Sequence, residues 1–210
     1  MIDLDVATEV NTATRTVGAR TLAAGEARTV TLSRVYDTDI DDLWDACTTA
    51  ERIPRWFAPV SGELKLGGHY QLEGNAGGTI EMCDPPSSFT ATWEYGGDVS
   101  WIELRLTEVD GGTRFTLEHI AHVDDERWNE FGPGAVGVGW DLGLVGLGLH
   151  VSTGGTFEYA EGQAWMASAN GVDFMRLASE SWYRANVAAG TDEKLAREAA
   201  DRTSAAYSGG

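Results

Sequence analysis

Short segments of alternating character fill the middle of this chain, and they constrain its fold more than any other feature. Pairs of glycine or proline divide residues 61–120 at Gly67-Gly68, Gly77-Gly78, Pro85-Pro86, Gly96-Gly97 and Gly111-Gly112. Segments of this length between tight turns predict antiparallel strands joined as a meander. The chain is therefore expected to fold around an antiparallel sheet.

The last three segments carry apolar side chains at every second position. Because side chains alternate across a strand, these segments would turn one apolar face to the same side of the sheet and a charged face to the other. The inward set is predicted to be Phe89, Ala91, Trp93, Tyr95, Ile102, Leu104, Leu106, Phe115, Leu117 and His119. An apolar face of this size needs a cover.

The glycine-rich segment 135–151 is the natural cover. It is apolar, contains Asp141 near its middle, and is slightly too short to span a bilayer, which predicts a buried helix. Glycine inside a helix costs about 1 kcal/mol relative to alanine. Gly139 and Gly143 therefore indicate close approach of a neighbour, either the helices that follow in the chain or the same helix of a second subunit in a homodimer.

The flanking segments predict further elements. Residues 29–36 alternate like a strand, a helix begins near Thr38, and a short second helix runs from Thr48 to Pro54. Two helices follow the glycine-rich segment, at 172–189 and at 192–206 with Thr191 as N-cap. Their apolar edges are predicted to be Phe174, Leu177, Ser181 and Ala185 in the first helix, and Leu195, Ala199 and Ala206 in the second.

Composition excludes some classes of function. Asp and Glu outnumber Lys and Arg by 33 to 15, giving a formal net charge of −18. This charge disfavours partners with phosphate backbones and anionic membrane surfaces. The N-terminus lacks the pattern of a signal peptide, so we expect a cytoplasmic protein in which Cys47 and Cys83 stay reduced and unpaired.

The chemistry-bearing residues are few. His119 is aimed at the apolar face, where a neutral imidazole could hydrogen-bond a ligand or act as a general base, although a satisfied core histidine is the simpler interpretation. His119 and His122 point to opposite faces of a strand and cannot bind one metal ion together. We therefore expect no metal site and no cofactor, and no catalytic residue is identified.

The order of elements and motifs over about 120 residues resembles the START-like, or SRPBCC, superfamily, and within it the proteins named after the activator of the heat-shock-protein-ninety ATPase. The similarity rests on Arg34-Val35-Tyr36, Leu43-Trp44-Asp45-Ala46, Arg55-Trp56-Phe57, Gly67-Gly68-His69-Tyr70, Pro85-Pro86, Thr92-Trp93-Glu94, Gly112-Thr113-Arg114, Leu117-Glu118-His119 and Gly139-Trp140-Asp141 followed by Leu144, Leu147 and Val151.

This resemblance implies an α+β helix-grip fold, in which a curved, seven-stranded antiparallel sheet wraps a long C-terminal helix around a cavity. We expect an N-terminal extension over residues 1–27, the START-like domain over 28–151, and a helical extension over 152–210 that packs on the domain.

The function predicted first is non-catalytic binding of a hydrophobic small molecule in the internal cavity. The alternatives are an enzyme similar to polyketide cyclases or dehydratases and a partner-binding protein like the ATPase activator. Large apolar side chains and one histidine are predicted to line the cavity, namely Trp93, Ile102, Leu104, Phe115, Leu117, His119, Trp140 and Leu144.

Overall fold

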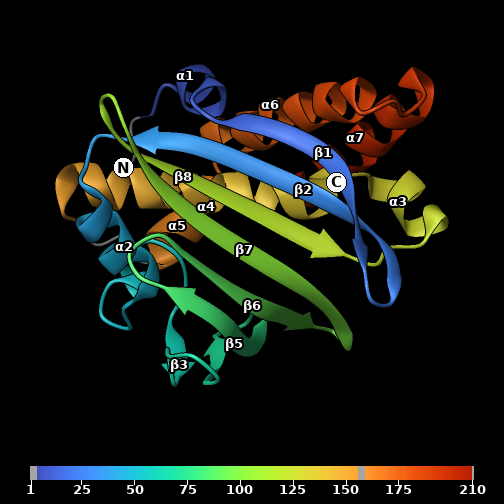
Figure 1. Ribbon diagram of the computed structural model, residues 1–210. Helices are drawn as coiled ribbons and strands as arrows, with labels where there is room; N and C mark the ends of the chain where they lie inside the picture. Colours follow the sequence, from blue (N-terminus) through green and yellow to red (C-terminus); the bar gives the residue numbers. More distant parts are fainter. Residues whose placement is uncertain (1–3, 156–158, 210) are drawn as a thin grey trace. The chain divides into compact units, whose positions relative to one another are not determined.

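The computed structural model describes residues 4–155 and 159–209. Its strands are β1 (Thr14–Leu22), β2 (Gly25–Tyr36), β3 (Val60–Gly62), β4 (His69–Leu72), β5 (Gly77–Asp84), β6 (Ser88–Tyr95), β7 (Asp98–Val109) and β8 (Gly112–Ala121). Its helices are α1 (Val6–Asn11), α2 (Ile40–Thr48), the 3-10 turn η1 (Ile53–Arg55), α3 (Asp125–Phe131), α4 (Gly134–Thr153), α5 (Tyr159–Met166), α6 (Ala169–Ala188) and α7 (Glu193–Ser208). Figure 1 follows these elements along the chain by colour.

The strands form one eight-stranded sheet in the order β1-β2-β8-β7-β6-β5-β4-β3. Neighbouring strands from β3 to β8 pair antiparallel, as the meander pattern predicts. The sheet has one strand more than the resemblance implies, because β1 in the N-terminal segment joins its edge. Gly96 and Gly97 both have positive φ, which allows the two-residue turn between β6 and β7 that glycine favours.

The chain divides into two compact units. The sheet unit contains Ser33–Ala121 and Gly143–Tyr159, and the extension unit contains Met1–Leu32, His122–Leu142 and Ala160–Gly210. Strand β2 and helix α4 each continue from one unit into the other. The units therefore do not coincide with consecutive stretches of the chain.

In the sheet unit, α2 contacts β7 and β8. Asp39 caps this helix by accepting a hydrogen bond from the backbone N–H of Asp42 at 2.8 Å. Leu43, Ala46 and Cys47 make up its buried stripe, as the helical spacing predicts. Both Cys47, which is buried, and Cys83, which is exposed, are free thiols.

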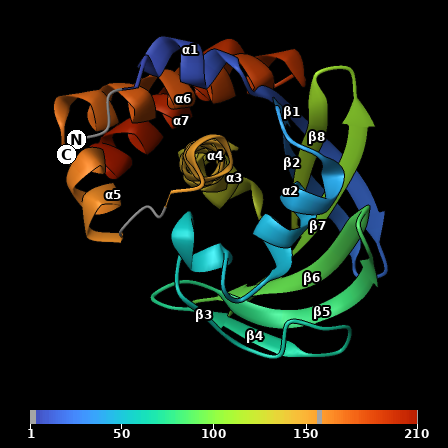
Figure 2. The ribbon, with the colours of Figure 1, turned by 90° about the vertical axis from the view of Figure 1, so that its left-hand side faces the viewer.

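In the extension unit, α6 contacts α1, β1 and α7, and α7 also contacts α3. Figure 2 shows α1, α6 and α7 gathered together. A buried ion pair joins β1 to α4 in the same unit: Nη2 of Arg15 lies 2.7 Å from Oδ1 of Asp141, and the two side chains are 5% and 1% exposed. The indole N–H of Trp182 in α6 donates to the same carboxylate.

Helix α4 is long and apolar enough to cross a membrane by length and composition alone, and 56% of its most apolar window is buried in the structure. Core helices of soluble proteins share these properties. In the extension unit α4 buries Val138 and Asp141, and in the sheet unit it buries Leu144, Val145 and Leu147. Helix α4 is apolar on all sides because its successive turns are buried.

The close approaches that the glycines of α4 predict exist, and the tightest lie at other glycines than the two named from sequence. A Cβ at Gly137 would overlap the Trp182 indole, and one at Gly146 would overlap the backbone carbonyl of Trp56. At Gly139 the nearest atom is the Tyr207 hydroxyl oxygen at 3.1 Å, and at Gly143 it belongs to the Phe57 ring at 3.4 Å. At Gly137 and Gly146 a side chain would force the neighbour to move, whereas at Gly139 the crowding is slight and at Gly143 the contact is an ordinary one.

Several local predictions were wrong. Tyr95 is 62% exposed because it ends β6 at a hairpin. Asp192, rather than Thr191, caps α7. Of the predicted edge of α7, Ala199 is buried, whereas Leu195 is 43% exposed and Ala206 is also exposed. The buried stripe of this helix is Ala196, Ala199, Ala200 and Thr203. The short helix predicted from Thr48 is the turn η1. In α6 the predicted Phe174 is buried, whereas Leu177, Ser181 and Ala185 are half-buried. The buried stripe of α6 is Gly171, Phe174, Met175, Ala178, Ser179, Trp182 and Asn186.

Candidate functional site

The apolar face of β6, β7 and β8 lies within the sheet unit, and we call it the inner face. Its cross-strand pairs are Ile102 with His119, Leu104 with Leu117, and Leu106 with Phe115, and Ala91 lies opposite Ile102 on the next strand. All of these residues are buried, as the alternation predicts: Ala91, Ile102, Leu104, Leu106, Phe115, Leu117 and His119. Cross-strand neighbours of this kind form a continuous apolar surface.

One end of the inner face is polar. Nε2 of His119 lies 2.9 Å from Oγ of Ser100, and this hydroxyl donates to the backbone carbonyl of Trp93 at 3.0 Å. Because the Ser100 proton is used on Trp93, His119 must donate through Nε2–H. The Trp93 ring meets the His119 ring edge-on, with centroids 6.3 Å apart. The three residues therefore hold one another in place.

Burial lowers the pKa of His119 to about 4. The imidazole is consequently neutral near pH 7, in the Nε2–H form that its hydrogen bond to Ser100 requires. A base this weak removes protons poorly at neutral pH. In the sheet unit, His119 is suited to hydrogen bonding rather than to proton transfer.

The second half of α4 is tied to the same region of the sheet unit. The Tyr36 hydroxyl donates to the backbone carbonyl of Leu144 at 3.0 Å, and the Tyr36 ring packs edge-on against Phe115. Leu144 and Leu147 are both buried. Tyr36 thus connects β2, β8 and α4 around the inner face.

The predicted site residues lie in both units, most of them in the sheet unit. Those on the sheet lie on the inner face, with Trp93 half-buried at its polar end, and Leu144 lies on α4 in the same unit. Trp140 is half-buried in the extension unit, and its role stays a prediction. Sequence reasoning missed Ser100 and Tyr36. The signal for Ser100 was available, since the hairpin register places it opposite Trp93.

A second polar cluster in the sheet unit surrounds Arg52. Its Nε donates to Nε2 of His150 at 3.1 Å, and its Nη1 donates to Oδ1 of Asp42 at 2.5 Å. Nδ1 of His150 lies 2.7 Å from the Gly155 carbonyl, so the imidazole accepts on one nitrogen and donates on the other. Each of these side chains has hydrogen-bond partners within the cluster, and the bonds connect the turn after α2 to the end of α4.

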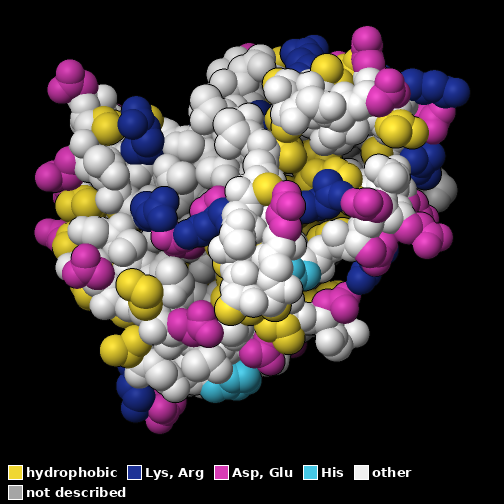
Figure 3. All heavy atoms as spheres, turned by 45° about the vertical axis from the view of Figure 1, so that its right-hand side comes forward, with side chains coloured by type: hydrophobic (Ala, Val, Ile, Leu, Met, Phe, Trp, Pro, Cys, Tyr) yellow, Lys and Arg dark blue, Asp and Glu magenta, His cyan; other side chains and the backbone are white. Residues whose placement is uncertain are grey.

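The buried thiol of Cys47 is poorly suited to nucleophilic catalysis. Burial raises the pKa of this thiol to about 12, which makes it a poor nucleophile. Within residues 4–155 and 159–209, no group of three or more His, Cys, Asp or Glu side chains is arranged to hold a metal ion. Figure 3 shows Asp and Glu side chains spread over the viewed face rather than gathered in one patch.

Comparison with known proteins identifies what the chain is similar to. The sequence profile described as "Activator of Hsp90 ATPase homolog 1-like protein" matches residues 37–151. The crystal structure of CalU16 from Micromonospora echinospora is 35% identical, with 82% of this chain and 97% of that chain covered and a TM-score of 0.66. The solution structure of CalU16 is 34% identical over 85% of this chain and 97% of that chain, with a TM-score of 0.71.

More distant similarity supports the fold alone. Protein MLL2253 from Mesorhizobium loti is 19% identical, with 60% of this chain and 97% of that chain covered and a TM-score of 0.54. No curated protein sequence matches the chain significantly. The α+β helix-grip fold expected from the sequence is confirmed by the CalU16 structures together with the sheet and the long helix described above.

Proposed function

Because this chain belongs to the family of Activator of Hsp90 ATPase homolog 1-like proteins, we propose that it is a helix-grip protein that binds a hydrophobic small molecule against its inner face without transforming it. The site consists of the inner face, its polar end at His119 and Ser100, and Leu144 on α4. The partner is the small molecule, and the protein acts as a carrier or sensor.

The observation that carries this proposal is the composition of the inner face. Three adjacent strands contribute mostly apolar side chains to it, and its polar groups are few: the neutral imidazole of His119 with the Ser100 hydroxyl at one end, and the buried Thr113 hydroxyl, which donates to the Thr38 carbonyl. Small-molecule sites combine a mostly apolar lining with a few placed polar groups. An apolar ligand would lie along the strands, and an oxygen-bearing group on it would lie near His119 and Ser100.

The enzymatic alternative, similar to polyketide cyclases or dehydratases, depends on the same histidine. Acid–base catalysis at neutral pH works best with a group whose pKa is near 7. The pKa of His119 is lowered to about 4 by burial, and its Nε2–H is already directed at Ser100. These two facts favour binding over catalysis.

Titration with a neutral, apolar fluorescent probe, N-phenyl-1-naphthylamine, tests the proposal. We expect the wild-type protein to bind the probe and Leu104→Trp to lose binding at least tenfold, because the added ring would occupy the space beside Leu117. Arg105→Trp is the matched control, since it places the same ring one residue later, where the Arg105 side chain is 54% exposed on the outer face. This control should bind the probe as the wild type does.

Two results would contradict the proposal. One is failure of the folded wild-type protein to bind the probe, and the other is equal binding by both tryptophan variants. Since Leu104 is 2% exposed, circular dichroism must first show that the variant folds. Ala91→Phe, on the neighbouring strand of the inner face, is the replacement if it does not.

A further inference from the structure

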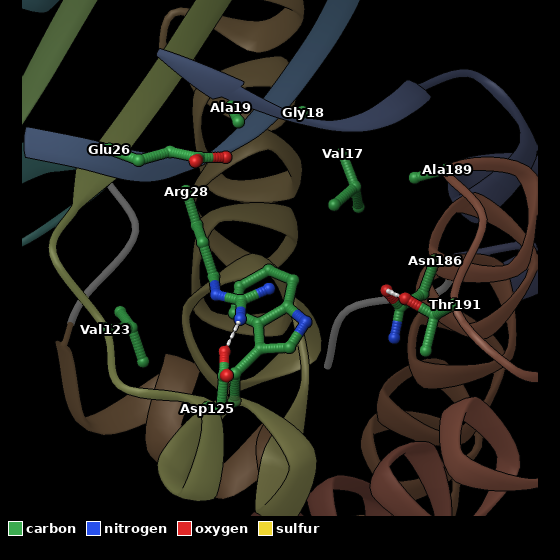
Figure 4. A pocket seen from close by; sticks show the side chains of 11 residues that line it. Val17, Gly18, Ala19, Glu26, Arg28, Val123, Asp125, Asn186, Ala189 and Thr191 are labelled. Atoms are coloured by element: carbon green, nitrogen blue, oxygen red, sulfur yellow. Dashed lines mark hydrogen bonds and ion pairs between the residues drawn. The ribbon is translucent and has the colours of Figure 1, made fainter. Parts of the chain in front are cut away.

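The extension unit contains a pocket of about 500 Å³ that is separate from the inner face. It lies between β1, β2, the start of α3 and the C-terminal end of α6 (Figure 4). Its volume is in the range of small-molecule sites. Most of its lining residues come from outside residues 37–151, so the pocket belongs largely to the segments that the family profile does not match. We call it the extension pocket.

One side of the extension pocket presents a positioned guanidinium. The Arg28 guanidinium lies 4.6 Å from the ring centroid of Trp128, which is itself 8% exposed, and it pairs with the carboxylate of Asp125. This cation–π contact and the ion pair together hold the guanidinium beside the pocket. Within the described residues, Nη2 makes the one hydrogen bond of this side chain, so Nε–H and Nη1–H are available to a ligand.

The opposite side presents a buried amide. Asn186 is 2% exposed, and its Oδ1 accepts a 2.8 Å hydrogen bond from the Thr191 hydroxyl. In Figure 4 both residues lie across the pocket from Arg28 and Asp125. Among the described residues, the Nδ2 amino group of Asn186 makes no hydrogen bond, and it is not one of the enclosed side-chain atoms that lack a partner. Since Asn186 lines the pocket, this amino group can donate to a ligand there.

The charges around the extension pocket determine the class of ligand. The carboxylates of Glu26 and Asp125 accept hydrogen bonds, and Arg28 and Asn186 donate them. Two carboxylates against one guanidinium, in a chain of formal charge −18, disfavour an anion. The guanidinium and the amide donor disfavour a cation. A neutral molecule with several hydroxyl groups satisfies both the donors and the acceptors.

We propose that the extension pocket binds a neutral, polyhydroxylated molecule of the size of a mono- or disaccharide. Arg28 and Asn186 would donate to its oxygens from opposite sides, and Glu26 and Asp125 would accept from its hydroxyl groups. This site is independent of the apolar ligand proposed for the inner face.

Saturation-transfer NMR with glucose and maltose tests this inference, with glucosamine and glucuronate as charged analogues. We expect the neutral sugars to bind the wild-type protein and to bind about tenfold more weakly to Arg28→Met and to Asn186→Asp, because each variant removes a donor. Arg28→Met keeps an apolar side chain over Trp128. Asp173→Asn, on the exposed side of α6, is the control and should bind as the wild type does.

Three results would overturn the inference: no binding of either neutral sugar at millimolar concentration, unchanged binding in both pocket variants, or tighter binding of a charged analogue. Arg28 is 32% exposed, so its variant is expected to fold even if Asn186→Asp does not. The apolar probe should bind Arg28→Met normally. That measurement keeps the two proposals distinguishable.

Discussion

The indole of Trp182 lies against the backbone of Gly137, and from there its N–H donates a 2.8 Å hydrogen bond to Asp141 one turn later in α4. Both contacts are buried, since Trp182 and Asp141 are 1% and 2% exposed. The ring can approach α4 this closely only because Gly137 has no side chain. Gly137 lowers the helix propensity of α4, and in return it allows Trp182 to pack closely and to form its hydrogen bond.

Gly137→Ala should therefore destabilise the protein. The new methyl group would overlap the indole and force Trp182 to move, at a cost of about 1–3 kcal/mol in the free energy of unfolding. Urea unfolding, monitored by circular dichroism, measures this loss in the free energy of unfolding. Gly139→Ala is the control in the same helix: its nearest neighbour is the Tyr207 hydroxyl at 3.1 Å, so the gain in helix propensity should offset much of any crowding. Equal effects at both positions would refute this explanation.

The Arg15–Asp141 pair predicts a larger effect. Asp141→Asn keeps an acceptor for Trp182 and removes the charge that Arg15 contacts, which leaves a guanidinium buried without a counter-charge. We expect a loss of about 3–5 kcal/mol in the free energy of unfolding, measured by urea denaturation. Adding Arg15→Met to this variant should recover part of the lost stability, because it removes the unpaired buried charge.

The exposed pair of Arg176 and Asp173 is the control for this experiment. Its side chains are 59% and 50% exposed, so Asp173→Asn should cost less than about 1 kcal/mol. If Asp141→Asn proves equally mild, the buried pair contributes little to stability.

The inner face could be predicted from the sequence, whereas the buried ion pair of Arg15 and Asp141 could not. Leu104 and Leu117 lie in strands whose strict alternation fixes which side chains turn inward, so burial followed from the pattern. Arg15 lies in a polar, threonine-rich segment with no apolar alternation, and β1 therefore went unpredicted. Its burial depends on Asp141, which is 126 residues away in the chain. Sequence spacing carries no signal for such a contact.

The C-terminal helices were predicted with about the right extent, but only part of each buried face was predicted correctly: Phe174 in α6 and Ala199 in α7 are buried as expected. Ala196, rather than Leu195, is buried in α7. A helix with many alanines has no dominant apolar stripe, so small residues packed against a neighbour decide which face is inward. In α6 the buried face follows Phe174, Ala178 and Trp182 at four-residue spacing, so the predicted position Ser181 is one residue away from the buried Trp182.

His119 predicts a pH dependence of stability. Its pKa is lowered from 6.5 to about 4 in the folded protein, so between these values the unfolded chain binds a proton that the folded protein does not. The contribution of His119 to the free energy of unfolding is therefore fully present above pH 6.5 and is lost as the pH falls toward 4. We expect the difference between wild type and His119→Gln to shrink by about 2–3 kcal/mol between pH 7 and pH 4.5. A difference that stays constant across this range would contradict the assignment.

The two thiols should differ in reactivity. Cys83 is exposed, whereas Cys47 is buried and the pKa of its thiol is raised to about 12. In native conditions at pH 8, a disulfide reagent should modify one thiol quickly and the second only after unfolding. Cys83→Ser should abolish the fast reaction, and Cys47→Ser should leave it intact. Fast modification of Cys83→Ser would show that α2 opens readily.

Helix α7 should contribute to stability rather than behave as a loose tail. The Thr203 hydroxyl donates to the Phe131 carbonyl at 2.7 Å, Arg202 donates to the carbonyls of Asn129 and Glu130, and Tyr207 donates to the Ala135 carbonyl. The bonds from Arg202 and Thr203 satisfy carbonyls in the last turn of α3, which has no continuing helix to satisfy them, and the bond from Tyr207 reaches the first turn of α4. Truncation after Gly190 removes all of them and exposes the surface of α6 that α7 covers.

We therefore expect truncation to lower the melting temperature by several degrees, since about 1 kcal/mol corresponds to roughly 2–4 °C in a chain of this size. Thr203→Val separates the hydrogen bond from the packing, because it keeps the shape of a side chain that is 1% exposed and removes its donor. It should cost about 1–3 kcal/mol, since the Phe131 carbonyl would stay buried without this partner. Ser208→Ala removes an exposed hydroxyl from the same helix and should leave the melting temperature unchanged. If truncation and Thr203→Val both leave it unchanged as well, α7 does not stabilise the extension unit.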